Sequence, residues 1–149
     1  MEWKRKRFTE LTTEELYRIL KLRVSVFVVE QNCPYPELDD RDQDAVHVWA
    51  EDAAGIRAYL RVLDWGVESP YVSIGRVVTA ERGIGLGDRV LEEGIRAAKE
   101  LFGAGSIYLE AQTYAEGFYE KHGFHRISEE FVEDGIPHIR MLMGDAENI

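Results

Sequence analysis

The stretch SIGRVVTAERGIGLGDRVL, residues 73–91, decides how this chain folds. Its first half is rich in β-branched residues, which favour a strand, and its second half has apolar residues at helical spacing. Gly83, Gly85 and Gly87 lie between the two halves. Glycine lets backbone N–H groups approach a phosphate closely, and the positive end of the following helix dipole attracts the same charge. The stretch therefore predicts a phosphate-bearing ligand bound between a strand and a helix.

Two common phosphate-binding motifs do not fit these glycines. A P-loop requires G-x-x-x-x-G-K-[ST], and neither that spacing nor the Lys-Ser/Thr pair is present. A dinucleotide-binding fingerprint requires G-x-G-x-x-G, which would place its last glycine where this chain has the carboxylate of Asp88. The pattern that remains is R-x-x-G-x-G, residues 82–87. Such a short pattern also fits the alternative that the glycines only allow a tight turn between strand and helix.

Hydrophobic periodicity predicts that strands and helices alternate along the rest of the chain. The expected strands cover residues 2–8, 46–51, 56–64, 71–80 and 106–112, followed by a closing hairpin over residues 124–143 that turns at Asp134-Gly135. The expected helices cover residues 13–30, 86–102 and 115–123, and Thr12 and Glu15 have the spacing of a capping box at the start of the first. Because the strand–helix–strand unit from residue 71 to residue 112 implies a parallel crossover, we expect an α/β fold with a mixed sheet. The length of 149 residues predicts a single domain, residues 1–149.

Composition limits the partners and the compartment of this chain. Its 28 acidic and 18 basic residues give a formal charge of −10, whereas a nucleic-acid-binding protein normally has a basic face. The one dense basic cluster, KRKR at residues 4–7, reads as a solvated strand. No apolar run approaches the ~20 residues that span a bilayer. Cys33 is the single cysteine, so no internal disulfide can form. We therefore expect a cytoplasmic protein that binds neither nucleic acid nor membrane.

A second motif, Y-x-x-x-G-F at residues 119–124, lies on the short helix expected after the next strand. Together with R-x-x-G-x-G and the order of the elements, it resembles the GCN5-related N-acetyltransferase (GNAT) family over almost the whole chain. Two further stretches, FVVEQNCPY (residues 27–35) and EDGIPHI (residues 133–139), are similar to the ElaA-like branch of that family. The resemblance implies a GNAT-type mixed central sheet flanked by helices, the acyl-CoA N-acyltransferase fold.

The resemblance also implies where acetyl-CoA would bind. In the family, the strand before the glycines pairs with the pantetheine arm, and the glycine loop holds the pyrophosphate through backbone N–H groups. By position, the residues that would pair with the pantetheine arm are Val77, Val78 and Thr79. The residues that would hold the pyrophosphate are Arg82, Gly83, Ile84, Gly85, Leu86 and Gly87. Two positions depart from the common pattern. Thr79 stands where many members have proline, and Gln112 stands where many have asparagine, whose amide contacts glutamine can also make.

Acetyl transfer requires a polarised thioester carbonyl and a proton for the leaving thiolate. The family position implies that Tyr119 donates this proton, from a phenol of pKa about 10 to a thiolate of pKa about 8.5. The carbonyl would be polarised by a backbone N–H of residues 77–79, at a bulge that family members have there. The alternative is that Tyr119 only packs the short helix against the sheet.

Three residues are candidates for the base that takes the proton of the amine: Glu110, Glu30 and His138. The amine could also arrive neutral, with no dedicated base. Cys33 reads as a small buried hydrophobe because no cysteine–histidine signature accompanies it. The four histidines are scattered without ligand spacing, so we expect no metal.

The acceptor is expected to be cationic. Residues 31–44 contain two prolines and five acidic residues, and they should form a long irregular loop. With Glu30, its residues Glu37, Asp39 and Asp40 would border the acceptor, which suggests a polyamine, an aminoglycoside-like compound or a lysine-bearing peptide.

The predicted activity is transfer of acetyl from acetyl-CoA to a primary amine by direct attack in a ternary complex. Two alternatives stay open. One is another acyl donor, although the acidic carrier protein used by acyl-homoserine lactone synthases would be repelled by a chain of this charge. The other is a non-catalytic module that binds acetyl-CoA or a protein partner. The chain could also assemble as a homodimer.

Overall fold

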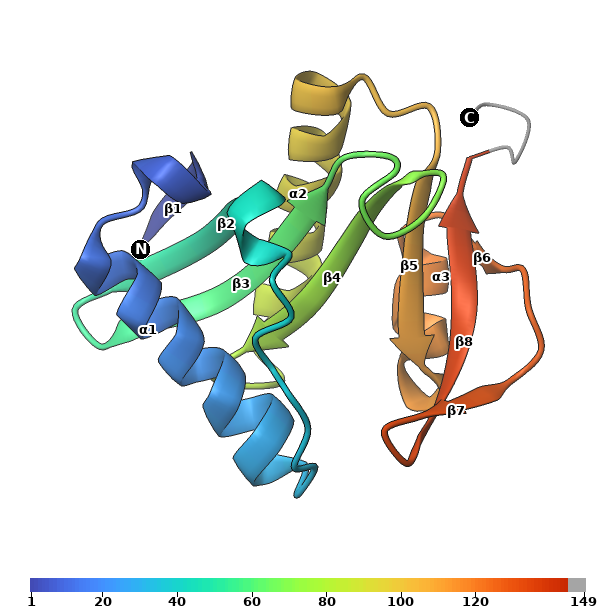
Figure 1. Ribbon diagram of the computed structural model, residues 1–149, viewed down its shortest axis with the longest axis horizontal. Coiled ribbons are helices and arrows are strands. Elements are labelled where there is room, and N and C mark those ends of the chain that lie inside the picture. The colour runs from blue at the N-terminus through green and yellow to red at the C-terminus, as the bar shows by residue number, and fades with distance from the viewer. Residues whose placement is uncertain (145–149) are drawn as a thin grey trace.

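The computed structural model describes residues 1–144 as one mixed sheet with helices on both of its faces (Figure 1). The strands are β1 (Glu2–Arg7), β2 (Ala45–Asp52), β3 (Gly55–Leu63), β4 (Val72–Thr79), β5 (Ile107–Gln112), β6 (Phe124–Arg126), β7 (Phe131–Glu133) and β8 (Ile136–Met143). Their spatial order is β1-β2-β3-β4-β5-β8-β6, and β7 also pairs with β8. Neighbouring strands are antiparallel except β4 and β5, which are parallel. The predicted mixed α/β sheet is confirmed.

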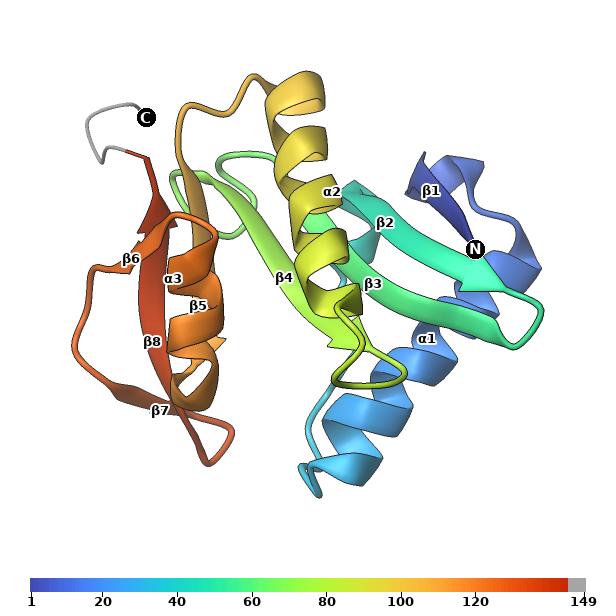
Figure 2. The ribbon, with the colours of Figure 1, turned by 180° about the vertical axis from the view of Figure 1, so that it is seen from behind.

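The helices α1 (Thr13–Arg23) and α2 (Leu86–Phe102) cover opposite faces of the sheet, and α3 (Glu116–Lys121) lies beside β5 on the face of α2 (Figure 2). Val90 and Leu91 of α2 belong to the larger buried core, on one face of β2–β5. Ile19 of α1 packs with Trp49 and Tyr59 in a second core on the other face. No helix in residues 1–144 combines the length and apolar character needed to cross a membrane.

The first helix begins as predicted but changes its form before it ends. Thr12 and Glu15 make the predicted capping box, since each side chain accepts a hydrogen bond from the backbone N–H of the other. After Arg23 the chain continues as a π-helix, Val24–Glu30, so the helix predicted over residues 13–30 is α-helical only in its first part. Four valines occupy this segment, and β-branched side chains crowd the preceding turn of an α-helix. We attribute the wider turn to that crowding.

The closing hairpin turns at Asp134-Gly135 as the sequence predicts, but its first arm is interrupted. Residues 127–130 leave the sheet, so β6 and β7 pair separately with different parts of β8. The turn between β7 and β8 therefore projects beyond the point where β6 pairs (Figure 1).

The two parallel strands, β4 and β5, pair only where they begin. Val72 is opposite Ile107 and Ser73 is opposite Tyr108, and the remaining residues of these two strands are not paired with each other. Because β3 holds β4 and β8 holds β5, the two halves of the sheet diverge as a fork (Figure 1). The fork leaves one edge of each strand open, and this opening positions the site.

Candidate functional site

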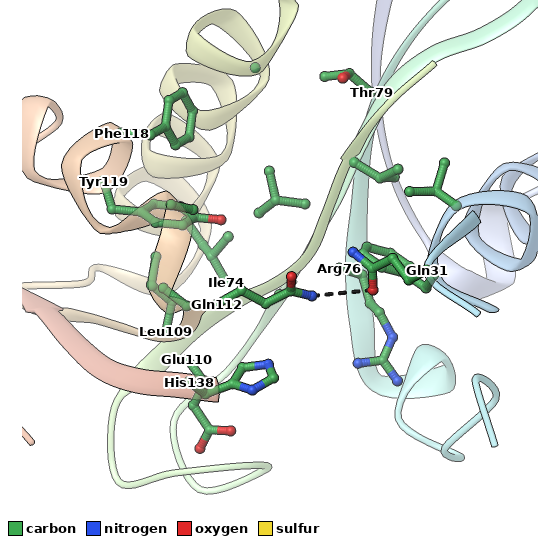
Figure 3. A pocket seen from close by; sticks show the side chains of 18 of the residues that line it. Gln31, Ile74, Arg76, Thr79, Leu109, Glu110, Gln112, Phe118, Tyr119 and His138 are labelled. Atoms are coloured by element: carbon green, nitrogen blue, oxygen red, sulfur yellow. Dashed lines mark hydrogen bonds between the residues drawn. The ribbon is translucent and has the colours of Figure 1, made fainter. Parts of the chain in front are cut away.

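A cavity of about 910 Å³ lies in the opening between β4 and β5. This volume suits a ligand of cofactor size. Side chains from both strands, from α3 and from the segment after the π-helix surround it (Figure 3). Its glycine-loop end is formed by α3 and by residues 79, 81–83 and 85–88. Its charged end is formed by Arg61, Arg76 and Glu110, by the β7–β8 turn, and by the loop residues Cys33, Tyr35, Pro36, Asp39 and Arg41.

The backbone of β4 is irregular beside the cavity. The register of β3 against β4 shifts between Tyr59 and Arg61, so Leu60 alone faces both Arg76 and Val77. This is a β-bulge, which bends a strand and redirects its polar groups. Arg76 has a φ of 55°, a left-handed conformation that is uncommon for a residue other than glycine. The bulge expected at residues 77–79 thus begins one residue earlier.

The glycine loop leaves its backbone N–H groups accessible. Gly83 and Gly85 have φ of 84° and 80°, and a Cβ at either position would meet only open space. Gly85 is the N-cap of α2 and supplies no capping side chain, so the first N–H groups of this 17-residue helix are not capped. Such a helix start attracts an anion. The arrangement fits a pyrophosphate, as the sequence predicts for this loop.

The charged side chains of the glycine-loop end are paired at the surface. Arg82 Nη1 lies 2.8 Å from Glu30 Oε1, and the two side chains are 64% and 50% exposed. An exposed pair contributes at most ~1 kcal/mol, so a phosphate can take the place of Glu30. Asp88 accepts a hydrogen bond from His122 Nε2 at 2.8 Å, which lowers the pKa of its carboxyl. Lys121 of α3 lies 3.5 Å from the same Asp88 oxygen, and its positive charge offsets the negative charge that Asp88 presents to a bound anion.

Tyr119 is packed through its ring and turns its hydroxyl toward the cavity. Its ring packs edge-on against Phe118, with centroids 5.1 Å apart, and against Phe124, with centroids 6.0 Å apart. Its hydroxyl points into the cavity (Figure 3). Burial raises the pKa of Tyr119, so the phenol keeps its proton well above neutral pH. The ring is structural, and the hydroxyl is available to a ligand.

Two contacts join the halves of the molecule across the cavity. Gln112 Nε2, at the end of β5, donates to Gln31 Oε1 at 3.3 Å (Figure 3). Cys33 Sγ donates to the backbone oxygen of Asp134 at 3.3 Å. Cys33 is buried, as expected. The Cys33–Asp134 contact brings together the stretches FVVEQNCPY and EDGIPHI, which are about a hundred residues apart in the chain.

The three candidate bases are placed differently. Glu110 lines the charged end, and its Oε2 accepts a hydrogen bond from the Tyr108 hydroxyl at 2.7 Å. His138 lines the same end, and its Nδ1 lies 2.7 Å from the backbone oxygen of Ile136. A carbonyl only accepts, so Nδ1 carries the proton and Nε2 of the neutral ring is free to take one. Glu30 is not among the cavity-lining residues. Of the predicted acetyl-CoA contacts, only Ile84 is also outside the lining.

The sequence profile of the family described as "Acetyltransferase (GNAT) domain" matches residues 12–144. The chain belongs to the GNAT family. Protein ElaA of Escherichia coli (strain K12) is 37% identical to it over 147 residues, 95% of each chain. A UPF0039 protein of Mycobacterium tuberculosis (strain H37Rv) is 42% identical over 139 residues, which cover 89% of this chain and 86% of that protein.

Solved structures of GNAT relatives have the same fold. The crystal structure of an acyl-CoA N-acyltransferase from Pseudomonas aeruginosa superposes with a TM-score of 0.91 at 40% identity, covering 97% of this chain and all of that one. Escherichia coli ElaA superposes with a TM-score of 0.89 at 36% identity, covering 95% of this chain and 98% of that one. The predicted acyl-CoA N-acyltransferase fold and ElaA-like branch are confirmed. By family the chain is an N-acetyltransferase.

The acidic loop of this GNAT chain does not supply the free negative charge expected of it. Glu37 is buried, and its Oε2 lies 2.8 Å from Arg23 Nε and 2.7 Å from Arg76 Nε. Asp39 pairs with Arg61 and lies 3.5 Å from Arg76. The expectation that these two carboxylates attract a cationic acceptor is therefore wrong: arginines already neutralise them. Asp40 is exposed and lies outside the cavity lining.

Sequence reasoning missed the arginines of this network, Arg23, Arg61 and Arg76. A signal was present, because Arg61 and Arg76 interrupt the apolar runs of two expected strands. A charged residue in a buried strand requires a partner of opposite charge. The acidic loop was the part of the sequence able to provide one.

Proposed function

We propose that this N-acetyltransferase uses acetyl-CoA as donor and a primary amine as acceptor, by direct attack with both substrates bound. One observation carries the proposal. The open fork places the glycine loop, the unpaired edge of β4 and the Tyr119 hydroxyl around a single cavity. A phosphate site, an edge for the pantetheine amides and a proton donor are what acyl transfer from CoA needs.

The proposed reaction proceeds with few groups. The amine nitrogen attacks the thioester carbon, while backbone N–H groups of Val77, Val78 or Thr79 hold the oxygen as it becomes negative. The C–S bond then breaks, and the thiolate takes its proton from the hydroxyl of Tyr119. The attacking nitrogen loses its proton to Glu110, to His138 or to water. Glu110 and His138 lie together at the charged end, across the cavity from Arg76 (Figure 3).

We propose a cationic acceptor on the basis of other carboxylates than those in the loop. Glu133 and Asp134, at the β7–β8 turn, line the charged end and form no salt bridge within residues 1–144. Burial and the charge of Glu110 raise the pKa of Glu133. A cation between such carboxylates relieves their repulsion. A second ammonium group beside the reacting amine, as in a polyamine or a lysine-bearing peptide, would pair with the carboxylates of Glu133 and Asp134.

The test is a panel of amines in an assay for thiol release from acetyl-CoA. The panel contains matched cationic, neutral and anionic acceptors, with a reaction lacking acceptor as the blank. We expect release that depends on the acceptor, with the cationic amines turned over fastest. Release at the same rate without any amine, or no binding of acetyl-CoA in calorimetry, contradicts the proposed function. Preference for a neutral or anionic amine contradicts only the acceptor class.

A further inference from the structure

Arg76 occupies a backbone position that normally requires glycine. It is the first residue of the β4 bulge and has a φ of 55°. Bulges whose first residue is left-handed usually have glycine there, because a Cβ is sterically disfavoured in this conformation. Other interactions must therefore hold Arg76 in this conformation.

The side chain of Arg76 makes such interactions with the loop between the π-helix and β2. Its Nε lies 2.7 Å from Glu37 Oε2, and its Nη2 donates to the backbone oxygen of Glu37 at 3.1 Å. Nη2 also lies 3.5 Å from Asp39 Oδ2. The guanidinium stands 6.0 Å from the centre of the Tyr35 ring. We call Glu37 and Asp39 the acidic clamp.

The acidic clamp is itself held rigidly. Arg23, which is fully buried, binds Glu37 through Nε at 2.8 Å and donates from Nη2 to its backbone oxygen. The Tyr35 hydroxyl donates to the other oxygen of the Glu37 carboxylate. Arg61, also buried, holds Asp39 from β3. Charged hydrogen bonds in a buried setting are strong and directional, so the two carboxylates of the clamp are fixed in position relative to Arg76.

We propose that Arg76 is a positioning residue, whose ion pairs with the acidic clamp keep the bulge of β4 in its left-handed form and thereby aim the amides of Val77–Thr79 at the thioester. This inference rests on the proposed function, which assigns those amides to the carbonyl oxygen. The ion pairs fix the position of the Arg76 side chain and so stabilise the left-handed backbone conformation at this residue. Without these ion pairs, nothing offsets the steric cost of a left-handed conformation at a residue with a Cβ, and the bulge relaxes. The amides of Val77–Thr79 are then displaced and no longer donate to the developing oxyanion.

The proposal makes glycine and alanine at this position behave differently. Arg76→Gly removes the clamp, but glycine adopts the left-handed conformation without a Cβ clash, so the bulge persists. Arg76→Ala removes the clamp and keeps the Cβ, so the strand relaxes. We expect kcat of Arg76→Gly within about threefold of the native value and kcat of Arg76→Ala lower by about tenfold or more. KM for the amine should change alike in both variants, because both remove the Arg76 guanidinium from the cavity lining.

A matched pair of variants controls for general effects of glycine and alanine in a strand. Arg5 lies on β1, is absent from the cavity lining, and pairs with Glu100 at 3.2 Å. Its backbone is not left-handed. Arg5→Gly and Arg5→Ala should leave kcat unchanged, and glycine should be no better than alanine there.

Glu37→Gln tests the clamp from its other side. It should lower kcat in the native background and should have no further effect on kcat in the Arg76→Gly background, where the bulge no longer depends on the clamp. Hydrogen exchange supplies a readout that needs no activity: protection of the Val77 and Val78 amides should change in Arg76→Ala and not in Arg76→Gly. Thermal unfolding confirms that each variant is folded.

Equal loss of kcat in the glycine and alanine variants overturns the proposal and makes the Arg76 side chain a contact of the substrate. Native kcat in both variants overturns it as well. A native enzyme that releases no thiol from acetyl-CoA with any amine refutes the proposed function instead. In that case the exchange measurement still decides whether the clamp holds the bulge.

Discussion

The two ends of the cavity are built on different principles. The glycine-loop end presents backbone groups from consecutive residues, 82–87, and depends on conformations that only glycine adopts readily. The charged end is assembled from side chains on β3, β4, β5, the β7–β8 turn and the loop before β2, and buried ion pairs hold that loop. A donor with an invariant phosphate suits the first kind of site. The second kind can differ among relatives while the fold stays the same.

The difference also sets how each end responds to change. A backbone site changes only when the chain conformation or the local charge changes, and most side-chain substitutions leave it intact. A network of paired charges is sensitive to each member, because losing one partner leaves the other buried and unpaired. Substitutions can therefore separate donor binding, chemistry and acceptor recognition.

The largest effect is expected at Tyr119, which lies between the two ends. Tyr119→Phe keeps the ring that packs on Phe118 and Phe124. It should lower kcat by roughly 10²-fold, the lower range for loss of a general acid, and leave the Kd of acetyl-CoA within about twofold. Because burial raises the pKa of Tyr119, native activity should persist to alkaline pH without a loss near the ordinary phenol pKa.

Steady-state kinetics and calorimetry measure both quantities. Tyr17→Phe, on the exposed face of α1, is the matched control and should behave as the native protein. A fall in affinity with kcat intact makes Tyr119 a contact of CoA. If neither value moves in the folded variant, Tyr119 has no part in the chemistry.

The next effect tests the glycine-loop end alone. Gly85→Asp and Gly85→Asn place side chains of nearly equal size at the same left-handed position, which both residues tolerate better than most. Only aspartate brings a negative charge to the pyrophosphate. Calorimetry should show the Kd of acetyl-CoA at least tenfold weaker for aspartate than for asparagine, about 1.4 kcal/mol. Equal affinities in the two folded variants would remove the pyrophosphate from this loop.

A smaller effect is expected at the charged end. Glu133→Gln removes one of the carboxylates that form no salt bridge in residues 1–144. It should lower kcat/KM about threefold for a cationic amine, and raising the salt concentration should have a similar effect on the native enzyme. Glu129→Gln, on the exposed segment between β6 and β7, is the control. A neutral amine should respond to neither change, and an equal response from both amines argues against electrostatic attraction.

The last effect concerns stability and not kinetics, and it reports on the side-chain network. His47 is fully buried on β2, with Nδ1 2.7 Å from the Tyr59 hydroxyl and Nε2 2.9 Å from the backbone oxygen of Asp42. Burial lowers the pKa of His47 below its ordinary 6.5. Between that lowered pKa and 6.5 the unfolded chain binds more protons, so the free energy of unfolding decreases as the pH falls.

The slope from this single group is at most ~1.4 kcal/mol per pH unit. Thermal unfolding between pH 7 and pH 5 measures it as a decrease of a few degrees in Tm. His47→Gln, which can keep one of the two hydrogen bonds, should have a lower Tm at pH 7 and a flatter dependence on pH. An unchanged dependence would show that other groups determine it.

The sequence predicted the elements and the family because their signals are local. A capping box at Thr12 and Glu15 needs only residues three apart, and the glycines of residues 82–87 select their conformation by themselves. The parallel crossover followed from the order of elements between residues 71 and 112. The change from α-helix to π-helix at Val24 was missed, because hydrophobic periodicity alone predicted one helix over residues 13–30 and does not register the crowding of the four valines.

By itself, then, the sequence determined the mixed sheet, the glycine loop and the position of Tyr119 on a short helix after β5. Only the tertiary structure decided that the acidic loop is neutralised by arginine and that Arg76 adopts a left-handed bulge. The physical reason is the distance along the chain between the residues that interact. A glycine's φ depends on its immediate neighbours, whereas the charge that Glu37 presents depends on Arg76, which is 39 residues away in the chain and 2.7 Å away in space.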